Sequence, residues 1–219
     1  MKWWDSSANP EPPCEEDAKH YHIFFIDFAK AYDNVSRKYL FRLLELIGVP
    51  RGYRNILWAL FHNVHAIPAV GAKTKVRIPM LDGLKQGCPL SCLLFILAID
   101  VLLMHANQVP EVDPRCFADD LAVGFRDWCQ VAAVLDLVDE WSRAAGPVPN
   151  VKKTKFITTA SLLGNYTMHL PPKWREVSAA ETYVYLGVLI GAAVDVTMVY
   201  GAALMKFLNR VAKTIDTTK

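Results

Sequence analysis

Short apolar segments bounded by turn residues predict several strands. Residues 21–27, YHIFFID, are rich in aromatic and β-branched side chains and are typical of a buried strand that ends at Asp27. Residues 115–124, RCFADDLAVG, predict a tight hairpin with Asp119 and Asp120 at or beside its turn. Further strands are predicted in 64–79 (two strands around a turn near Gly71 and Ala72), 155–159, 166–170 and 183–190.

Helical periodicity accounts for most of the remaining chain. After Ser36, a plausible N-cap, apolar residues recur at the i, i+3, i+4 and i+7 positions, and Gly48 and Pro50 end the pattern. Further helices are predicted at 51–63 (apolar face Tyr53, Ile56, Leu57, Leu60), from Leu90 onward, at 127–145 (Val131, Val134, Leu135, Val138) and at 197–213. This order of strands and helices favours an α+β domain with an antiparallel sheet over a doubly wound one.

Composition narrows the class of protein. The chain has 219 residues, of which 53% are hydrophobic, enough for one large domain or two small ones. Residues 90–104 are the most apolar stretch, but they are fewer than the roughly 20 needed to span a bilayer and include Asp100. We therefore interpret them as a core helix and expect no membrane partner.

Charge and cysteine content do little by themselves to identify the function of the chain. The net charge of +2 is too small to indicate nucleic-acid binding, so any basic surface must be local. Lys73, Lys75 and Arg77 alternate along one predicted strand, which fits either a solvated face or contact with a phosphate backbone. Five cysteines without a CxxC pair argue against disulfides and zinc. The first residues hold no apolar signal segment, so we expect intracellular residence, nuclear or cytoplasmic.

The carboxylates are the strongest candidates for chemistry. Asp119 and Asp120 lie in an apolar segment, where unpaired carboxylates are costly unless a cation compensates. Neighbouring strands would bring Asp27 close to Asp119, and because strand side chains alternate between faces, Asp27 and Asp119 rank above Asp120. Such a cluster suits two-metal phosphoryl transfer. On spacing alone, three carboxylates at unrelated surface turns remain the alternative.

Five motifs in order carry a family resemblance. They are IDFAKAYD (26–33), GLKQGCPLSCLLF (83–95), FADD (117–120), NVKKTK (150–155) and YLG (185–187). Together they resemble the palm motifs of reverse transcriptases of the non-LTR retrotransposon and group II intron type. The resemblance implies a right-hand polymerase palm at 20–192, a loosely packed lead-in at 1–19, and a C-terminal helix at 193–219 that starts a thumb. Fingers and thumb are largely missing and would come from a longer parent chain.

The resemblance also implies roles for individual residues around the nucleotide. Two Mg²⁺ or Mn²⁺ ions would be held by Asp27, Asp119, Asp120 and the backbone carbonyl of Phe28. The backbone of Lys30 and Ala31 would face the triphosphate of a dNTP. Tyr32 matches the steric gate that rejects a ribose 2′-hydroxyl, with a core aromatic as the alternative.

Further roles concern the template and primer. Gln86 and Gly87 match the segment along the incoming nucleotide and the RNA template. Lys153 matches a general acid toward pyrophosphate, although a solvated charge run explains it as well. Tyr185, Leu186 and Gly187 resemble the grip on the DNA primer. Asp33 is expected to cap the following helix.

Two departures from the family pattern stand out: Phe117 replaces a frequent Tyr, and Cys92 replaces a usual Pro. The sequence thus predicts an RNA-directed DNA polymerase domain derived from a retroelement. The alternative is a catalytically silent palm remnant that at most binds nucleic acid. A metal-dependent nuclease is a weaker third reading, which Tyr32 and Gln86 disfavour.

Overall fold

The structure is a computed structural model that describes residues 21–67, 76–126, 128–158, 168, 170–191, 194–195, 198–199, 201 and 205. The predicted lead-in at 1–19 lies outside these residues. So do most of the predicted strand at 166–170 and most of the predicted helix at 197–213.

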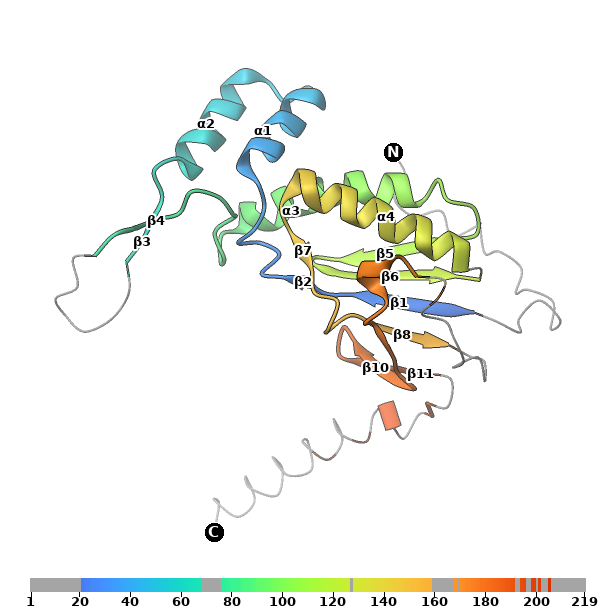
Figure 1. Cartoon of the computed structure of the whole chain (residues 1–219). Coiled ribbons are helices and arrows are strands. Elements are labelled where there is room, and N and C mark those ends of the chain that lie inside the picture. The colour runs from blue at the N-terminus through green and yellow to red at the C-terminus, as the bar shows by residue number, and fades with distance from the viewer. Residues whose placement is uncertain are drawn as a thin grey trace, which may run out of the picture.

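A five-stranded sheet forms the centre of the fold (Figure 1). Its order is β5-β6-β1-β8-β9, with β1 at His22–Ile26, β5 at Asp113–Phe117, β6 at Asp120–Phe125, β8 at Lys155–Thr158 and β9 at Ser178–Ala179. All pairs are antiparallel except β8 with β9. The predicted α+β class with an antiparallel sheet is therefore confirmed.

Two long helices, α3 (Pro89–Ala106) and α4 (Trp128–Ala145), cover one face of the sheet (Figure 1). The predicted face of α4, Val131 to Val138, is buried, as are Leu94, Ala98 and Leu102 of α3. By length and composition alone α3 could cross a membrane, but this buried face packs into the core with the sheet and α4. We therefore retain its interpretation as a core helix.

The opposite face of the sheet carries a small hairpin. Residues 183–190, predicted as a strand, are two strands, β10 (Thr182–Tyr185) and β11 (Val188–Gly191). Leu186 and Gly187 both have positive φ, +50° and +81°, which is the backbone of a tight two-residue hairpin turn. Tyr183 stacks on Phe25 of β1 at 4.5 Å between ring centroids and attaches this hairpin to the sheet.

A helical lobe projects away from the sheet (Figure 1). It consists of α1 (Arg37–Leu46), α2 (Arg51–Phe61) and the short paired strands β3 (His65–Ala66) and β4 (Ile78–Pro79). Ser36 is the N-cap of α1, as predicted, and accepts a hydrogen bond from the Tyr39 N–H. The turn near Gly71, with Lys73 and Lys75, lies outside the described residues.

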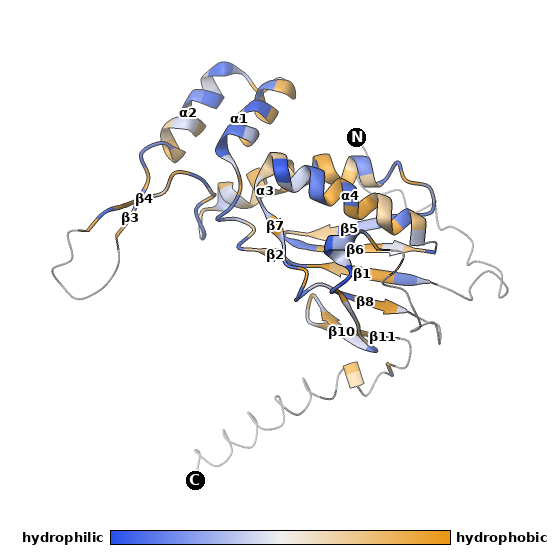
Figure 2. Ribbon diagram, viewed as in Figure 1, coloured by the Kyte–Doolittle hydropathy of each residue, from blue (hydrophilic) through white to orange (hydrophobic). Residues whose placement is uncertain are grey.

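The apolar face predicted for α2 is largely exposed. Tyr53 is 66% exposed and Ile56 60%, and the buried residue of this helix is Phe61. Figure 2 shows apolar positions, in orange, along the helices of this lobe as well as in the sheet and its covering helices. Periodicity therefore located the helix correctly, but it did not identify what covers its apolar side.

Arg37 joins this lobe to the rest of the domain. Its side chain is 8% exposed and donates hydrogen bonds to four backbone carbonyls. The acceptors are the carbonyls of Gly83 (2.9 Å), Phe61 (2.7 Å), Met80 (2.8 Å) and Asp82 (3.2 Å). One guanidinium thus connects the start of α1 to the end of α2, to the residue after β4 and to the loop that leads into α3.

Candidate functional site

Strand register brings two of the predicted carboxylates together. Ile26 of β1 pairs with Leu121 of β6, so one step further along the pair Asp27 lies opposite Asp120. Residues directly opposite each other in an antiparallel pair have side chains on the same face. That face is the one that carries Phe25, Ala122 and the β10–β11 hairpin. Asp120, and not Asp119, is therefore the direct neighbour of Asp27 across the strands.

Asp119 occupies the turn of the β5–β6 hairpin. Phe117 pairs with Asp120, so Ala118 and Asp119 form a two-residue turn, and Ala118 has φ of +54°. Asp119 lies close enough to Tyr32 for its charge to raise the pKa of that phenol. The predicted hairpin, with Asp119 in its turn and Asp120 beside it, is confirmed.

Asp120 is repelled by the charges of the other two carboxylates. Partial burial raises the pKa of Asp120, and the charges of Asp119 and Asp27 raise it further. None of the ion pairs among the described residues involves these three side chains. Within the same residues, no three His, Cys, Asp or Glu side chains are gathered closely enough to hold a metal ion. The cluster is therefore a site of unbalanced negative charge.

This repulsion predicts a pH-dependent gain in stability from Asp120→Asn. Folding raises the pKa of Asp120 above its ordinary value of 3.8. The fold is therefore destabilised by this carboxyl as pH rises from 3.8 through the pKa of the folded state. We expect the variant to unfold at higher denaturant concentration than the wild type at neutral pH. The difference should shrink toward zero below about pH 3.8. A difference that is equal at all pH values would contradict the charge explanation.

Asp27 is held in place by the segment that follows β7 (Val148–Pro149). The Asn150 N–H donates to the Asp27 carbonyl at 2.7 Å, and the Asp27 N–H donates to the Thr154 hydroxyl at 3.3 Å. Thr154 is fully buried, and its hydroxyl donates to the Asn150 carbonyl at 3.0 Å. Lys153 lies in this turn with an exposed side chain. Lys153, the predicted general acid, therefore lies on a turn that is hydrogen-bonded to Asp27, a predicted metal ligand.

Removing the Thr154 hydroxyl should weaken this connection. Thr154→Val keeps the shape of the side chain but leaves the partly buried Asp27 N–H without its acceptor. We expect the free energy of unfolding to fall by about 1–3 kcal/mol. Thr154→Ser, which keeps the hydroxyl, serves as the matched control in urea unfolding. Equal stability of the Val and Ser variants would show that the hydroxyl does not hold Asp27.

The predicted nucleotide-facing loop follows Asp27. Phe28 is buried in β2 (Phe28–Ala29), which pairs with β7, and its ring meets Trp141. Lys30 is exposed with φ of +47°, whereas Ala31 is buried. Tyr32 stacks on Phe95 of α3 at 4.5 Å. Burial and a hydrogen bond with Cys92 raise its pKa to about 12. Tyr32 is thus packed against the core and also faces Asp119, so the two interpretations of this residue are compatible.

The loop containing Gln86 and Gly87 lies against this segment. The Leu84 N–H donates to the Tyr32 carbonyl at 2.8 Å. A Cβ on Gly83 would lie 2.3 Å from the Asp33 carbonyl oxygen, so this close approach requires glycine. Gln86 donates to the Asp33 carboxylate at 3.2 Å. The predicted capping role of Asp33 is wrong, because Ser36 caps α1 and Asp33 instead binds Gln86.

The β10–β11 hairpin completes the arrangement. The Tyr185 hydroxyl donates to the Asp120 carbonyl at 3.1 Å, which fixes the hairpin next to the carboxylates. Leu186 and Gly187 form its exposed turn. All five motifs predicted to be functional therefore converge on one end of the sheet, although they are up to about 160 residues apart in the sequence.

Sequence reasoning missed two positioning residues, Thr154 and Arg37. Thr154 lies inside the NVKKTK motif, but its sequence context does not reveal that its hydroxyl accepts from the Asp27 N–H. The partners of Arg37 are backbone carbonyls at 61, 80, 82 and 83, which no side-chain pattern reveals. Among the described residues, Cys88, Cys92, Cys116 and Cys129 are free thiols.

Comparison with known families agrees with this arrangement. The family described as "Reverse transcriptase (RNA-dependent DNA polymerase)" matches residues 2–190. The chain belongs to the reverse transcriptase family. Its non-LTR retrotransposon type is supported by the Pol polyprotein of the R2 retrotransposable element from Popillia japonica, 26% identical over 185 residues. Another similar protein is the transposon TX1 149 kDa protein of Xenopus laevis, 24% identical over 178 residues.

This reverse transcriptase chain corresponds to a part of those relatives. The R2 match covers 77% of the chain but 30% of the polyprotein, and the TX1 match covers 76% and 13%. Among solved structures, telomerase from Candida tropicalis, in complex with a fragment of telomeric RNA, has a TM-score of 0.61 at 10% identity. The structural match covers 82% of this chain and 30% of the telomerase chain. This similarity supports the predicted palm-like polymerase fold.

Proposed function

We propose that this reverse transcriptase chain is the palm of an RNA-directed DNA polymerase that adds dNTP to a primer 3′-hydroxyl. The observation that carries the proposal is the register that places Asp27 beside Asp120, with Asp119 in the adjoining turn and no cationic side chain of the described residues paired to any of them. The palm would span 20–192, with a helix at 193–219 leading toward a thumb.

The donor set fits hard divalent cations. Asp120, whose pKa is raised by burial and by the charges of Asp119 and Asp27, would be stabilised by a cation, and Mg²⁺ takes oxygen ligands of this kind. Asp27, Asp119, Asp120 and the Phe28 carbonyl would hold two Mg²⁺ or Mn²⁺ ions. The described side chains are not gathered around one point, so binding would have to draw them together. When bound, the ions would supply charge stabilisation at the attacking and leaving oxygens.

The chain's own residues would select and orient the substrates. Tyr32, rigidly stacked on Phe95 beside Asp119, would exclude a ribose 2′-hydroxyl. The backbone of Lys30 and Ala31 would face the triphosphate. Gln86, held by Asp33, and Gly87 would lie along the nucleotide and the RNA template. The turn at Tyr185, Leu186 and Gly187 would hold the primer end. Lys153 would donate a proton to the departing pyrophosphate.

Primer extension tests the proposal. The chain is incubated with an oligo-dT primer on poly-rA, with dTTP and Mg²⁺ or Mn²⁺, and Asp119→Asn runs beside the wild type. We expect extension in the wild type and none in the variant. Extension that persists in Asp119→Asn would overturn the metal assignment. Bound template-primer without extension, even after separately expressed fingers and thumb segments of a relative are added, would favour the silent remnant.

A further inference from the structure

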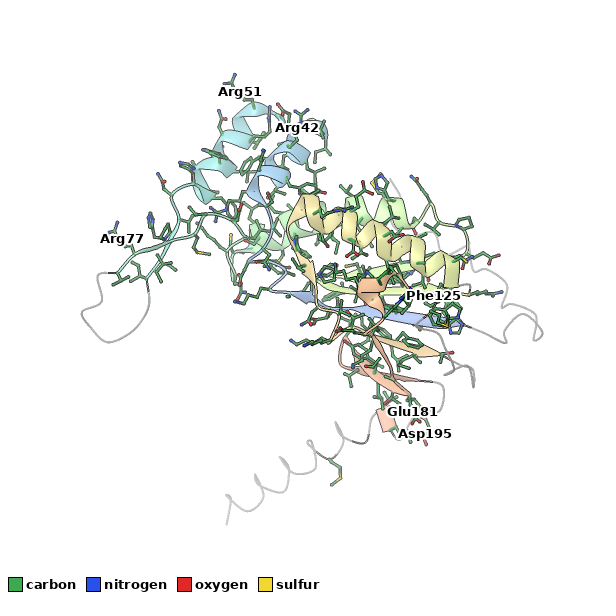
Figure 3. All side chains as sticks on the ribbon, viewed as in Figure 1. Arg42, Arg51, Arg77, Phe125, Glu181 and Asp195 are labelled. Carbon is green, nitrogen blue, oxygen red and sulfur yellow. The ribbon has the colours of Figure 1, made fainter. Side chains whose placement is uncertain are left out.

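The positive charge of the chain is concentrated in residues 37–88, the segment that contains the helical lobe. Residues 37–88 contain nine of the 24 Lys and Arg residues but two of the 22 Asp and Glu residues. This segment therefore has a net charge of +7 in a chain of net charge +2, and the remainder is net negative. Figure 3 shows Arg42, Arg51 and Arg77 pointing outward from the lobe. A partner of the lobe should therefore be an anion, since charge complementarity guides association.

A pocket of about 370 Å³ opens on this lobe between α1, α2 and the loop after β4. Its size falls within the roughly 300–1,000 Å³ of ligand sites. Phe61, 2% exposed, lines the bottom, and the Arg37 guanidinium lies 6.0 Å from its ring centroid. Asp82 is the acidic residue of the lining, and its Oδ1 accepts from the Arg37 backbone N–H at 3.0 Å. Lys38 is also part of the lining and is exposed.

The wall of the pocket is aromatic, and neighbouring rings hold the Trp58 indole in one orientation. Trp58 is 49% exposed and stacks on His62, with ring centroids 5.0 Å apart and 22° between planes. Phe41 meets Trp58 edge-on at 5.1 Å and 73°. The indole is therefore fixed from two sides while half of its surface faces solvent. Aromatic rings beside cations are the combination that binds single-stranded nucleic acid, through base stacking and phosphate contact.

We propose that this pocket, lined by Trp58, His62, Phe41 and Lys38, binds an unpaired nucleotide of a single-stranded RNA. Its base would stack on Trp58, and its phosphate would lie near Lys38 and above the buried charge of Arg37. The choice of RNA rests on the proposed function, whereas the preference for an unpaired base rests on the pocket alone. The site is distinct from the carboxylate cluster, but Leu81 and Asp82 connect it directly to the loop of Gln86.

Binding of a fluorescently labelled, short single-stranded RNA, followed by anisotropy in EDTA, tests the proposal without the polymerase reaction. Trp58→Ala should lose roughly fivefold to a hundredfold in affinity, the effect of one stacked base. Trp58→Phe should retain most of it. Tyr53→Ala, on the same helix and more exposed but outside the pocket, is the matched control and should bind as the wild type does. Lys38→Gln should make the salt dependence shallower by about one ion contact.

A photocrosslink provides a measurement on the unaltered chain. RNA carrying 5-iodouridine should crosslink to the peptide that contains Trp58. Crosslinks confined to other peptides, or equal affinity of the Trp58→Ala and Tyr53→Ala variants, would overturn the proposal. Equal loss of affinity for a duplex RNA would overturn it too, because it would show contact with the backbone alone. Because the assay contains EDTA and no dNTP, it does not depend on the carboxylate cluster, so failure of the pocket and failure of the polymerase function are separable.

Discussion

Replacing Asp27 with Asn is expected to lower the rate of primer extension by at least about a thousandfold. Asp27 lies opposite Asp120 and adjoins the Phe28 carbonyl, so its loss would remove charge from both proposed ion positions. Several kcal/mol of charge stabilisation would disappear, and each ~1.4 kcal/mol is a factor of ten in rate. Steady-state extension on poly-rA measures the effect. Asp136→Asn, exposed on α4 and away from the site, is the control and should extend as the wild type does.

The variants Asp119→Asn and Asp120→Asn test which of the two aspartates holds a metal ion together with Asp27. Sequence reasoning ranked Asp119 above Asp120, whereas the strand register brings Asp120 next to Asp27. If Mg²⁺ is held at Asp27 and Asp120, the stabilisation of the fold by Mg²⁺ should be weaker in Asp120→Asn than in the wild type. Near wild-type activity of Asp27→Asn would refute the metal assignment altogether.

Arg37→Ala is expected to cost about 3–4 kcal/mol of unfolding free energy. The substitution removes four hydrogen bonds from a charged donor to carbonyls around a buried side chain, and those carbonyls lose their partner. Because a domain is stable by only about 5–15 kcal/mol, this is a large fraction of the total. Urea unfolding at constant pH measures the change.

Two variants make the Arg37 test specific. Arg37→Lys keeps the charge but presents three donors from one atom, so it should recover only part of the loss. Arg42→Ala removes an arginine from an exposed ion pair on the same helix and should change stability little. If Arg37→Ala behaved like Arg42→Ala, the four carbonyls would have to be satisfied by water, and Arg37 would not hold the lobe to the domain.

The sequence predicted the elements that local chemistry determines. The strand ending at Asp27, the Asp-Asp hairpin and the Ser36 cap depend on residues close together in the chain, and all three are confirmed. The bond between Gln86 and Asp33 and the exposure of Tyr53 depend on contacts between distant segments. Register also decided which Asp faces Asp27, because a shift of one residue reverses every side chain of a strand. Pattern alone does not determine register.

The φ of +54° at Ala118 limits which residues evolution or a designer can place in the Asp-Asp turn. A side chain branched at Cβ is strongly disfavoured in that conformation, and alanine itself is there at a cost of roughly 1 kcal/mol. Glycine at this position should raise the melting temperature, yet it would also loosen the backbone on which Asp119 sits. The alanine therefore costs some stability of the fold but fixes the direction of the backbone that carries the Asp119 carboxylate.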